Sequence, residues 1–182
     1  MRQKTEQAVK TLKEGGIILY PTEGVYGLGC DPFNETAVTR LLKLKKRKVD
    51  KGLILIAANW GQVKSLIKID PTKQKLIKEK RGEPITWVFP ATKKAPKWVT
   101  GKFKTIAIRV TTHPGAKKIC QRFGGPIVST SANLSRKKSI KKLTQVDKKI
   151  LAGVDFVVPG STGNLGKPTE ICDVKTGVAI RV

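Results

Sequence analysis

Histidine, cysteine and acidic residues are scarce in this sequence of 182 residues, and each shortage excludes a kind of chemistry. His113 is the single histidine, which excludes a metal centre built on several histidines. A Ser-His-Asp triad would need His113, but no Gly-x-Ser-x-Gly elbow accompanies it, and the next residue, Pro114, favours a helix start. The cysteines Cys30, Cys120 and Cys172 are widely separated, so we expect neither a structural zinc site nor a disulfide framework. The 13 acidic residues show no arrangement typical of paired-carboxylate catalysis.

Long apolar runs are also missing. No stretch approaches the ~18 consecutive apolar residues that indicate a membrane-spanning helix. Residues 1–6 lead into an amphipathic pattern without the apolar core of a signal peptide. We therefore expect a protein that uses no membrane, is not secreted and works in a reducing cytoplasm. We expect residues 1–182 to form a single domain, because no repeat, low-complexity tail or linker divides them.

The common nucleotide-binding signatures are absent as well. The nearest approach to a phosphate-binding P-loop, residues 160–169, has Ser161 in place of the first glycine and Pro168 after Gly166-Lys167. No Gly-x-Gly-x-x-Gly dinucleotide fingerprint occurs. If this protein binds a nucleotide, it must do so with a different set of groups.

Positive charge is abundant. The sequence has 37 Lys and Arg against 13 Asp and Glu, a formal net charge of +24. Such an excess favours polyanionic partners such as nucleic acids and nucleotides. A general lysine bias that decorates a solvated surface would give the same number. The charge therefore indicates a class of partner and not an activity.

Helical and strand patterns alternate irregularly along the chain. This mixture predicts an α/β (α+β) fold with a twisted mixed sheet flanked by helices, not a doubly wound parallel sheet. Apolar residues at helical spacing predict helices over 5–14, 34–44, 59–67 and 115–123. Short apolar runs predict strands over 17–20, 53–58, 85–89, 105–110 and 126–130, and a final hairpin of 171–174 with 178–181.

Several helix starts are marked by capping residues. Asn34 and Asn59 stand before apolar helical patterns, and Asp70-Pro71 combines a capping residue with proline at the first helical position. Thr144 with Asp147 predicts a capping box for a helix that runs through residue 151. Residues 21–29 are too rich in glycine for a helix.

Two polar segments could bind phosphate. Lys45-Lys46-Arg47-Lys48, with Lys51 beyond, follows the second helix, where cations could bind phosphate oxygens or satisfy the helix dipole. Ser129-Thr130-Ser131-Ala132-Asn133 follows a strand and could line a nucleotide pocket or form an ordinary polar turn. Because surface cations contribute little to stability, we expect Lys45→Ala and Arg47→Ala to spare the fold.

Arg109 is a charge inside an apolar strand. By the period-two rule, Thr105, Ala107 and Arg109 share one face of that strand. A buried charge needs a partner, so Arg109 predicts either an anionic ligand or a place on an edge strand.

In combination these segments resemble the YrdC/Sua5 family. The resemblance is carried by residues 21–29 (PTEGVYGLG), Lys45-Lys46-Arg47 and Ser131-Ala132-Asn133, in this order and spacing. Residues 49–59 and 151–160 are similar to the short, single-domain bacterial form, and the likeness runs from the first helix to Arg181. The family implies a single YrdC-like domain with a basic concave surface.

The resemblance also implies an activity. Members of this family are threonylcarbamoyl-AMP synthases, which convert L-threonine, bicarbonate or CO2, and ATP into threonylcarbamoyl-adenylate and pyrophosphate for the t6A modification of tRNAs that read ANN codons. ATP would enter as a substrate together with Mg2+, and no bound prosthetic group or protein-held metal site is implied. The product would pass to a downstream threonylcarbamoyl-transferase complex.

Residue by residue, the resemblance implies a site with two parts. The expected ATP-binding residues, with the first two also catalytic, are Lys45, Arg47, Lys51, Thr105, Ser131, Asn133, Ser139 and Arg181. The expected threonine-binding residues are Thr22, Tyr26, Arg109 and Ser129.

This sequence departs from the longer family members at a few positions. Gly24 and Ile56 stand where those members have a threonine and a histidine associated with threonine binding. Thr169-Glu170 replaces a Ser-Thr pair, and Arg136 replaces a glycine. These departures leave the phosphate-binding residues intact but concern the recognition of threonine.

Two rival functions remain at this point. A non-catalytic factor that binds tRNA or double-stranded RNA, or assists ribosome assembly, would use a cluster of exposed cations. The sequence has few aromatic residues for such binding, 5%. A carbamoyl-phosphate-linked transferase of hydrogenase maturation shares the fold family but normally carries additional domains. The candidate cations for RNA are Arg136, Lys137, Lys138, Lys141, Lys142, Lys148 and Lys149.

Overall fold

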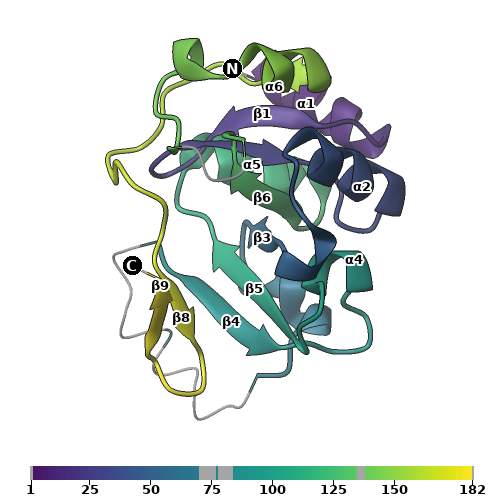
Figure 1. Cartoon of the computed structure of the whole chain (residues 1–182), viewed down its shortest axis with the longest axis vertical. Coiled ribbons are helices and arrows are strands. Elements are labelled where there is room, and N and C mark those ends of the chain that lie inside the picture. The colour runs from purple at the N-terminus through teal and green to yellow at the C-terminus, as the bar shows by residue number, and fades with distance from the viewer. Residues whose placement is uncertain (1, 70–76, 78–83, 135–137, 182) are drawn as a thin grey trace.

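One mixed sheet organises the computed structural model, which describes residues 2–69, 77, 84–134 and 138–181, with only the backbone described at Arg181. Nine strands of this described part follow the order β7-β1-β2-β6-β3-β5-β4-β8-β9 (Figure 1). The predicted mixed sheet is confirmed. The strands are β1 (Ile18–Pro21), β2 (Tyr26–Gly29), β3 (Ile54–Ala57), β4 (Thr86–Pro90), β5 (Thr105–Val110), β6 (Ile127–Ser131), β7 (Phe156–Val157), β8 (Ile171–Asp173) and β9 (Ala179–Arg181).

Helices cover both faces of the sheet. On one face α1 and α5 pack together, and on the other α2 and α6 cover β1 and its neighbours. The α-helices are α1 (Arg2–Lys13), α2 (Glu35–Leu44), α4 (Lys97–Thr100), α5 (Pro114–Phe123) and α6 (Lys148–Gly153). Short 3-10 helices lie at η1 (Val49–Lys51), η2 (Trp60–Leu66) and η4 (Leu143–Gln145).

The central strands are buried on both sides, and alternate residues serve two apolar cores. In β3, Leu55 packs into the core under α2, whereas Ile56 packs into the core between the sheet and α1 and α5. Ile54 and Ile56 share a face by the period-two rule. Because α1 and α5 cover only part of that face, the sheet stays accessible near Ile54, which is partly exposed.

Local capping explains where several helices begin. The Asn34 side chain accepts a hydrogen bond from the Ala37 amide at 3.0 Å, as the sequence predicted. The predicted helix start at Pro114 is confirmed, and the His113 ring accepts from the Ala116 amide at 3.3 Å. Asn59 also caps as predicted, although the helix that follows is a 3-10 helix.

Some expectations were wrong or incomplete. The helix expected from a Thr144 capping box begins only at Lys148, because Asp147 is its cap and accepts from the Lys149 amide at 2.9 Å. The expected helix start at Asp70-Pro71 lies outside the described residues. Strand β2, which contains two glycines, was not predicted. The structure explains one of them, because a side-chain carbon on Gly29 would lie 2.8 Å from the Val128 carbonyl oxygen.

Candidate functional site

A cavity of about 270 Å³ opens on the sheet face where Ile54 is exposed. Its walls come from the turn between β1 and β2, the loop after α2, strands β3, β5 and β6, and a segment before β8. The lining residues are Thr22, Gly24, Val25, Gly27, Arg47, Leu53, Ile54, Arg109, Ser129, Thr130, Ser131, Asn133, Ser139, Lys167, Pro168 and Thr169.

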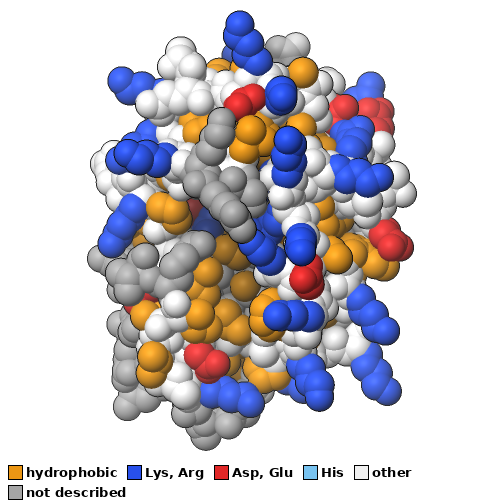
Figure 2. All heavy atoms as spheres, viewed as in Figure 1, with side chains coloured by type: hydrophobic (Ala, Val, Ile, Leu, Met, Phe, Trp, Pro, Cys, Tyr) orange, Lys and Arg blue, Asp and Glu red, His pale blue; other side chains and the backbone are white. Residues whose placement is uncertain are grey.

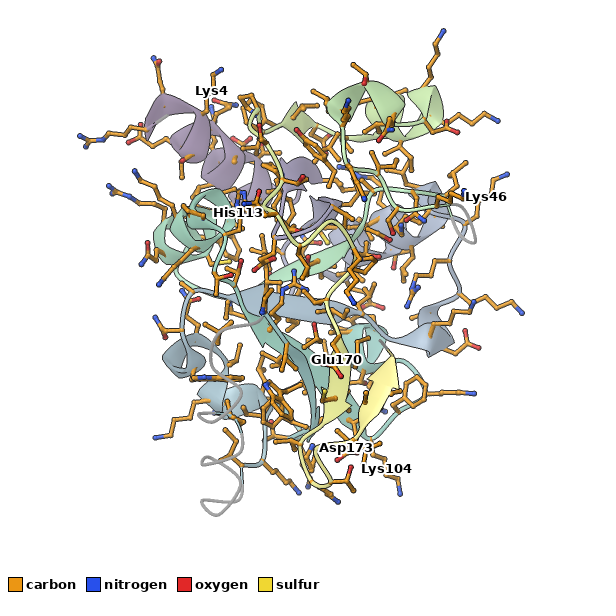
Figure 3. The ribbon with its side chains drawn as sticks, turned by 90° about the vertical axis from the view of Figure 1, so that its left-hand side faces the viewer. Lys4, Lys46, Lys104, His113, Glu170 and Asp173 are labelled. Atoms are coloured by element: carbon orange, nitrogen blue, oxygen red, sulfur yellow. The ribbon has the colours of Figure 1, made fainter. Side chains whose placement is uncertain are left out.

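The segment of residues 159–170, which we name the strap, crosses the turn between β1 and β2 on its way to β8 (Figure 1). The Gly163 amide donates to the Thr22 carbonyl at 2.9 Å, and the Leu165 amide donates to the Glu23 carbonyl at 3.1 Å. Figure 3 shows the strap running past His113 and down to Glu170. The strap therefore brings Lys167 and Thr169 into the cavity.

Gly24 is required by the strap. A side-chain carbon on Gly24 would lie 2.0 Å from the Lys167 carbonyl oxygen, so that carbonyl occupies the space of a side chain. A threonine at this position, which the resemblance implies for the longer family members, would not fit beneath this strap. Ile56, the other departure, is fully buried in the core behind the cavity.

The end of α2 separates two neighbouring cations. The Arg47 amide bonds to the Leu42 carbonyl at 2.9 Å and the Lys46 amide to the Lys43 carbonyl at 3.0 Å, which together form a Schellman motif. This motif needs a left-handed residue, and Lys46 adopts it with a φ of 51°. The turn leaves Lys46 pointing outward (Figure 3) and directs Arg47 into the cavity wall, where its Nη2 donates to the Gly52 carbonyl at 2.9 Å.

Lys45 is buried beneath the turn that follows β6. Its residue is only 3% exposed, and its Nζ donates to the carbonyl of Ser131 and, at 2.6 Å, to that of Asn133. Burial, and secondarily the charge of Arg47, lowers the pKa of Lys45 to about 8. The expectation that the loss of Lys45 would spare the fold assumed an exposed side chain, and this burial overturns that assumption.

The two segments predicted to converge do so. Arg47, from the loop after α2, and Ser131 and Asn133, from the end of β6, line the same cavity. Gly27 of β2 pairs with Ser131, so the absence of a side chain there keeps this part of the cavity open. Arg47 and the hydroxyls at the end of β6 thus form one polar wall.

Arg109 is held at a second part of the cavity. Its strand β5 lies between β3 and β4, so the interpretation of Arg109 as an edge-strand residue is wrong. Its Nη1 donates to the Thr169 hydroxyl at 2.9 Å and to the Thr86 hydroxyl at 3.4 Å. Its Nη2 lies 3.3 Å from a carboxylate oxygen of Glu23. The partner of this buried charge within the chain is therefore an acidic residue.

Glu23 is itself buried and fixed by hydrogen bonds. Its Oε1 accepts from the Thr111 hydroxyl at 2.6 Å and from the Thr112 amide at 3.0 Å. Burial acts to raise the pKa of Glu23, but the Arg109 charge and these hydrogen bonds together lower it. Glu23 therefore stays ionised and balances Arg109.

Most of the expected site residues border the cavity, and a few do not. Lys51 is exposed in η1, and Thr105 is half-buried at the start of β5. Neither residue lines the cavity. The Tyr26 hydroxyl instead donates to the Gly160 carbonyl and so anchors the strap. The side chain of Arg181 lies outside the described residues, as does Arg136. The expected residues that line the cavity are Thr22, Arg47, Arg109, Ser129, Ser131, Asn133 and Ser139.

Sequence reasoning missed the contributions of Glu23 and Lys167. Glu23 lies within the PTEG segment, but nothing in the sequence pairs it with Arg109. The only sequence signal for Lys167 is its place between Gly166 and Pro168, which marks a turn.

The described residues contain no group of three or more His, Cys, Asp or Glu side chains placed to hold a metal ion. Within the same part of the chain, no helix has the length and apolar character needed to cross a bilayer.

Comparison with known proteins places this fold and cavity in a family. The family model for Sua5, YciO and YrdC proteins, described as "Telomere recombination", matches residues 10–182. The chain belongs to this family.

The matching relatives include both sequences and solved structures. A threonylcarbamoyl-AMP synthase of Coxiella burnetii is 48% identical over 99% of this chain and 97% of the relative, and one of Pseudoalteromonas translucida is 46% identical over 96% and 95%. The structure of P. abyssi Sua5 complexed with L-threonine matches with a TM-score of 0.90 and 28% identity. That match covers 98% of this chain, which spans about half, 53%, of the Sua5 chain.

Proposed function

We propose that this protein is a threonylcarbamoyl-AMP synthase, which makes L-threonylcarbamoyl-adenylate and pyrophosphate from L-threonine, bicarbonate or CO2, and ATP. The observation that carries the proposal is a single cavity lined by Arg47, Ser131 and Asn133 on one side and by Arg109 on another. The names of the bacterial relatives, which cover almost the whole chain, support it.

The two parts of the cavity are far enough apart for two substrates. The Arg47 side chain contacts the carbonyl of Gly52, before β3 begins. The backbone of Arg109, in β5, lies beside that of Ile56, near the end of β3. Four residues of extended chain span on the order of 10 Å, which is enough to separate a triphosphate from an amino acid.

In this proposal the triphosphate binds at the end formed by Arg47, Ser131, Asn133 and Ser139. Arg47 offers a planar guanidinium for phosphate oxygens, and the hydroxyls and amide complete the polar wall. Lys45 acts as a positioning residue, because two of its N–H groups already bind the carbonyls of the turn. Its charge also lies next to the triphosphate.

Threonine binds at the Arg109 end. The Nε of Arg109 is buried and makes no hydrogen bond to the described residues, so a donor remains for the threonine carboxylate. Thr22, Ser129 and Thr169 are close enough to the same part of the cavity to contact the amino acid.

The chemistry needs no nucleophile from the protein. The threonine amine loses a proton and attacks CO2 to form a carbamate, and a carbamate oxygen then attacks the α-phosphorus of ATP. The bond to the β-phosphate oxygen breaks, and pyrophosphate leaves with its electron pair. Such a reaction depends on positioning and on cations that stabilise the charge on the phosphate oxygens. A cavity lined by arginine and hydroxyl groups supplies both.

Further parts of the proposal concern partners. Mg2+ enters with ATP, no prosthetic group takes part, and the product serves t6A modification through a downstream transferase complex in the cytoplasm. The exposed Lys138, Lys141 and Lys142 follow the cavity-lining turn and could hold a tRNA by its phosphates. Figure 2 shows Lys and Arg side chains at many places over the face in view, so general attraction of polyanions accompanies any local binding.

The decisive experiment is mass spectrometry of a mixture of the protein, ATP, Mg2+, threonine and bicarbonate labelled with heavy carbon. We expect a mixed anhydride that carries the label, together with pyrophosphate. Omission of bicarbonate or the variant Arg47→Gln should remove both products. Pyrophosphate release without incorporation of the label would contradict the proposal.

A further inference from the structure

The Arg109 end and the Arg47 end of the cavity differ in their charge balance. Lys45 and Arg47 are two cations close enough for the charge of Arg47 to disfavour the charge of Lys45. Arg109, in contrast, has the ionised carboxylate of Glu23 at 3.3 Å. One end of the cavity therefore concentrates positive charge, whereas at the other the charge of Arg109 is compensated by Glu23. Lys167, on the strap, is a further cation that lines the cavity.

This ion pair is built rigidly into the fold. Glu23 is 6% exposed and Arg109 is 5% exposed, and each is held by hydroxyl groups from other strands or loops. The backbone carbonyl of Glu23 also accepts from the Leu165 amide of the strap. Neither side chain can turn away without leaving hydrogen bonds unmade, so the charge balance of this end is fixed.

The two substrates have different charge. Threonine is a zwitterion without net charge, whereas ATP and inorganic phosphate are polyanions. An isolated arginine in a cavity binds phosphate as readily as carboxylate, because its planar fork matches both. A compensated arginine keeps its directional N–H donors but loses the long-range attraction for a polyanion.

We propose that Glu23 is a specificity-determining residue, which neutralises Arg109 so that the amino-acid end of the cavity rejects phosphate groups. Glu23 acts through Arg109 and touches no substrate, since it does not line the cavity. The inference rests on the proposed function only in naming threonine as the ligand of this end. The exclusion of phosphate follows from the ion pair itself.

The test compares Glu23→Gln with the native protein, using inorganic phosphate as the probe. Glutamine keeps an oxygen that accepts from Thr111 and the Thr112 amide, but it removes the negative charge. In the native protein we expect phosphate to compete with ATP and not with threonine. In Glu23→Gln we expect phosphate to compete with threonine as well, and the KM for threonine in its presence to rise roughly tenfold.

A second readout does not depend on turnover. Phosphate should raise the Tm of Glu23→Gln by more than it raises the Tm of the native protein, because a new site stabilises the folded state. Addition of Arg109→Met to Glu23→Gln should return this shift to the native value. A role of Glu23 in stability alone would lower the Tm but would create no phosphate site dependent on Arg109.

Two further variants complete the design. Glu23→Ala removes the carboxylate altogether, and it should give the same effects if Glu23→Gln fails to fold. Glu6→Gln breaks an exposed pair with Arg2, 3.2 Å apart on α1, and serves as the matched control without effect on phosphate.

The outcomes separate this inference from the proposed function. A folded Glu23→Gln, or a folded Glu23→Ala if it replaces that variant, with native phosphate competition and a native phosphate-dependent Tm would overturn the role of Glu23, whatever the native protein synthesises. A native protein that makes no adenylate, together with a phosphate site in Glu23→Gln that depends on Arg109, would overturn the proposed function and leave the charge argument standing.

Discussion

The ammonium group of Lys45 lies 2.6 Å from the carbonyl oxygen of Asn133, which is 88 residues further along the chain. This contact joins the loop after α2 to the turn after β6. It explains why the cationic and hydroxyl-rich segments form one wall of the cavity.

Lys45→Met should both destabilise the fold and abolish adenylate formation. Removal of the ammonium leaves two carbonyl groups near Lys45 without their donor, at a cost of about 2 kcal/mol in the free energy of unfolding. Arg47→Gln, at a half-exposed position in the same loop, should abolish synthesis and change stability by less than about 1 kcal/mol. Urea unfolding of the two variants measures the difference. Equal stability of both variants and the native protein would show that the Lys45 contacts contribute little.

The affinity for ATP should fall as the pH rises above 8. Lys45 has a pKa lowered to about 8, so it carries its charge below this pH and loses it above. Calorimetric titration of a non-hydrolysable ATP analogue measures this fall in affinity between pH 7 and pH 9, which lie on either side of the Lys45 pKa. Lys45→Met should bind weakly with little dependence on pH in this range. The Arg47 guanidinium disfavours the charge on Lys45, so its removal in Arg47→Gln should move the midpoint of the pH dependence of ATP binding to higher pH.

Gly24→Ala should displace the strap. The added methyl group would lie 2.0 Å from the Lys167 carbonyl, which forces the backbone apart and costs about 1–3 kcal/mol of stability. The KM values of both substrates should rise, since the strap supplies Lys167 and Thr169 to the cavity. Gly125→Ala is the matched control, because its nearest neighbours are ring atoms of Phe123 at 4.0 Å. Native kinetics in Gly24→Ala would contradict the role of the strap.

Lys46→Gly should stabilise the protein. Lys46 has a φ of 51°, a left-handed conformation that costs a residue with a side chain on the order of 1 kcal/mol and that glycine adopts freely. We expect a higher Tm in a thermal melt with unchanged kinetics. Lys46→Ala removes the same charge but keeps the unfavourable conformation, so it should show no gain. A stabilisation of equal size in both variants would point to charge repulsion instead.

The sequence was sufficient to predict the elements whose burial follows from their own pattern. The run that forms β3 is apolar throughout, the run that forms β5 is apolar except for Thr105 and Arg109, and Asn34 marks the start of α2 without any information from the rest of the chain. Strand β2 was not predicted, because the reason for a glycine at position 29 is the neighbouring Val128 carbonyl, which is distant in sequence.

The site was predictable only where residue type determines the role. Hydroxyls at the end of β6 and cations after α2 are residue types suited to phosphate binding, and together with their order and spacing they indicated a nucleotide site. The burial of Lys45 and the pairing of Glu23 with Arg109 depend on how separate segments meet, and no local pattern encodes them. The same holds for the strap, whose contacts with residues 22–24 arise from the tertiary fold alone.

The central claim is that Arg47 and Arg109 serve different substrates in one cavity, and separate calorimetric titrations of ATP and threonine test it most directly. Arg47→Gln should bind threonine with native affinity and ATP at least roughly tenfold more weakly. Arg109→Lys, which retains the charge opposite Glu23 but lacks the planar fork, should show the reverse. Equal loss of both ligands in each variant, with the fold intact, would contradict the division of the cavity into two ends.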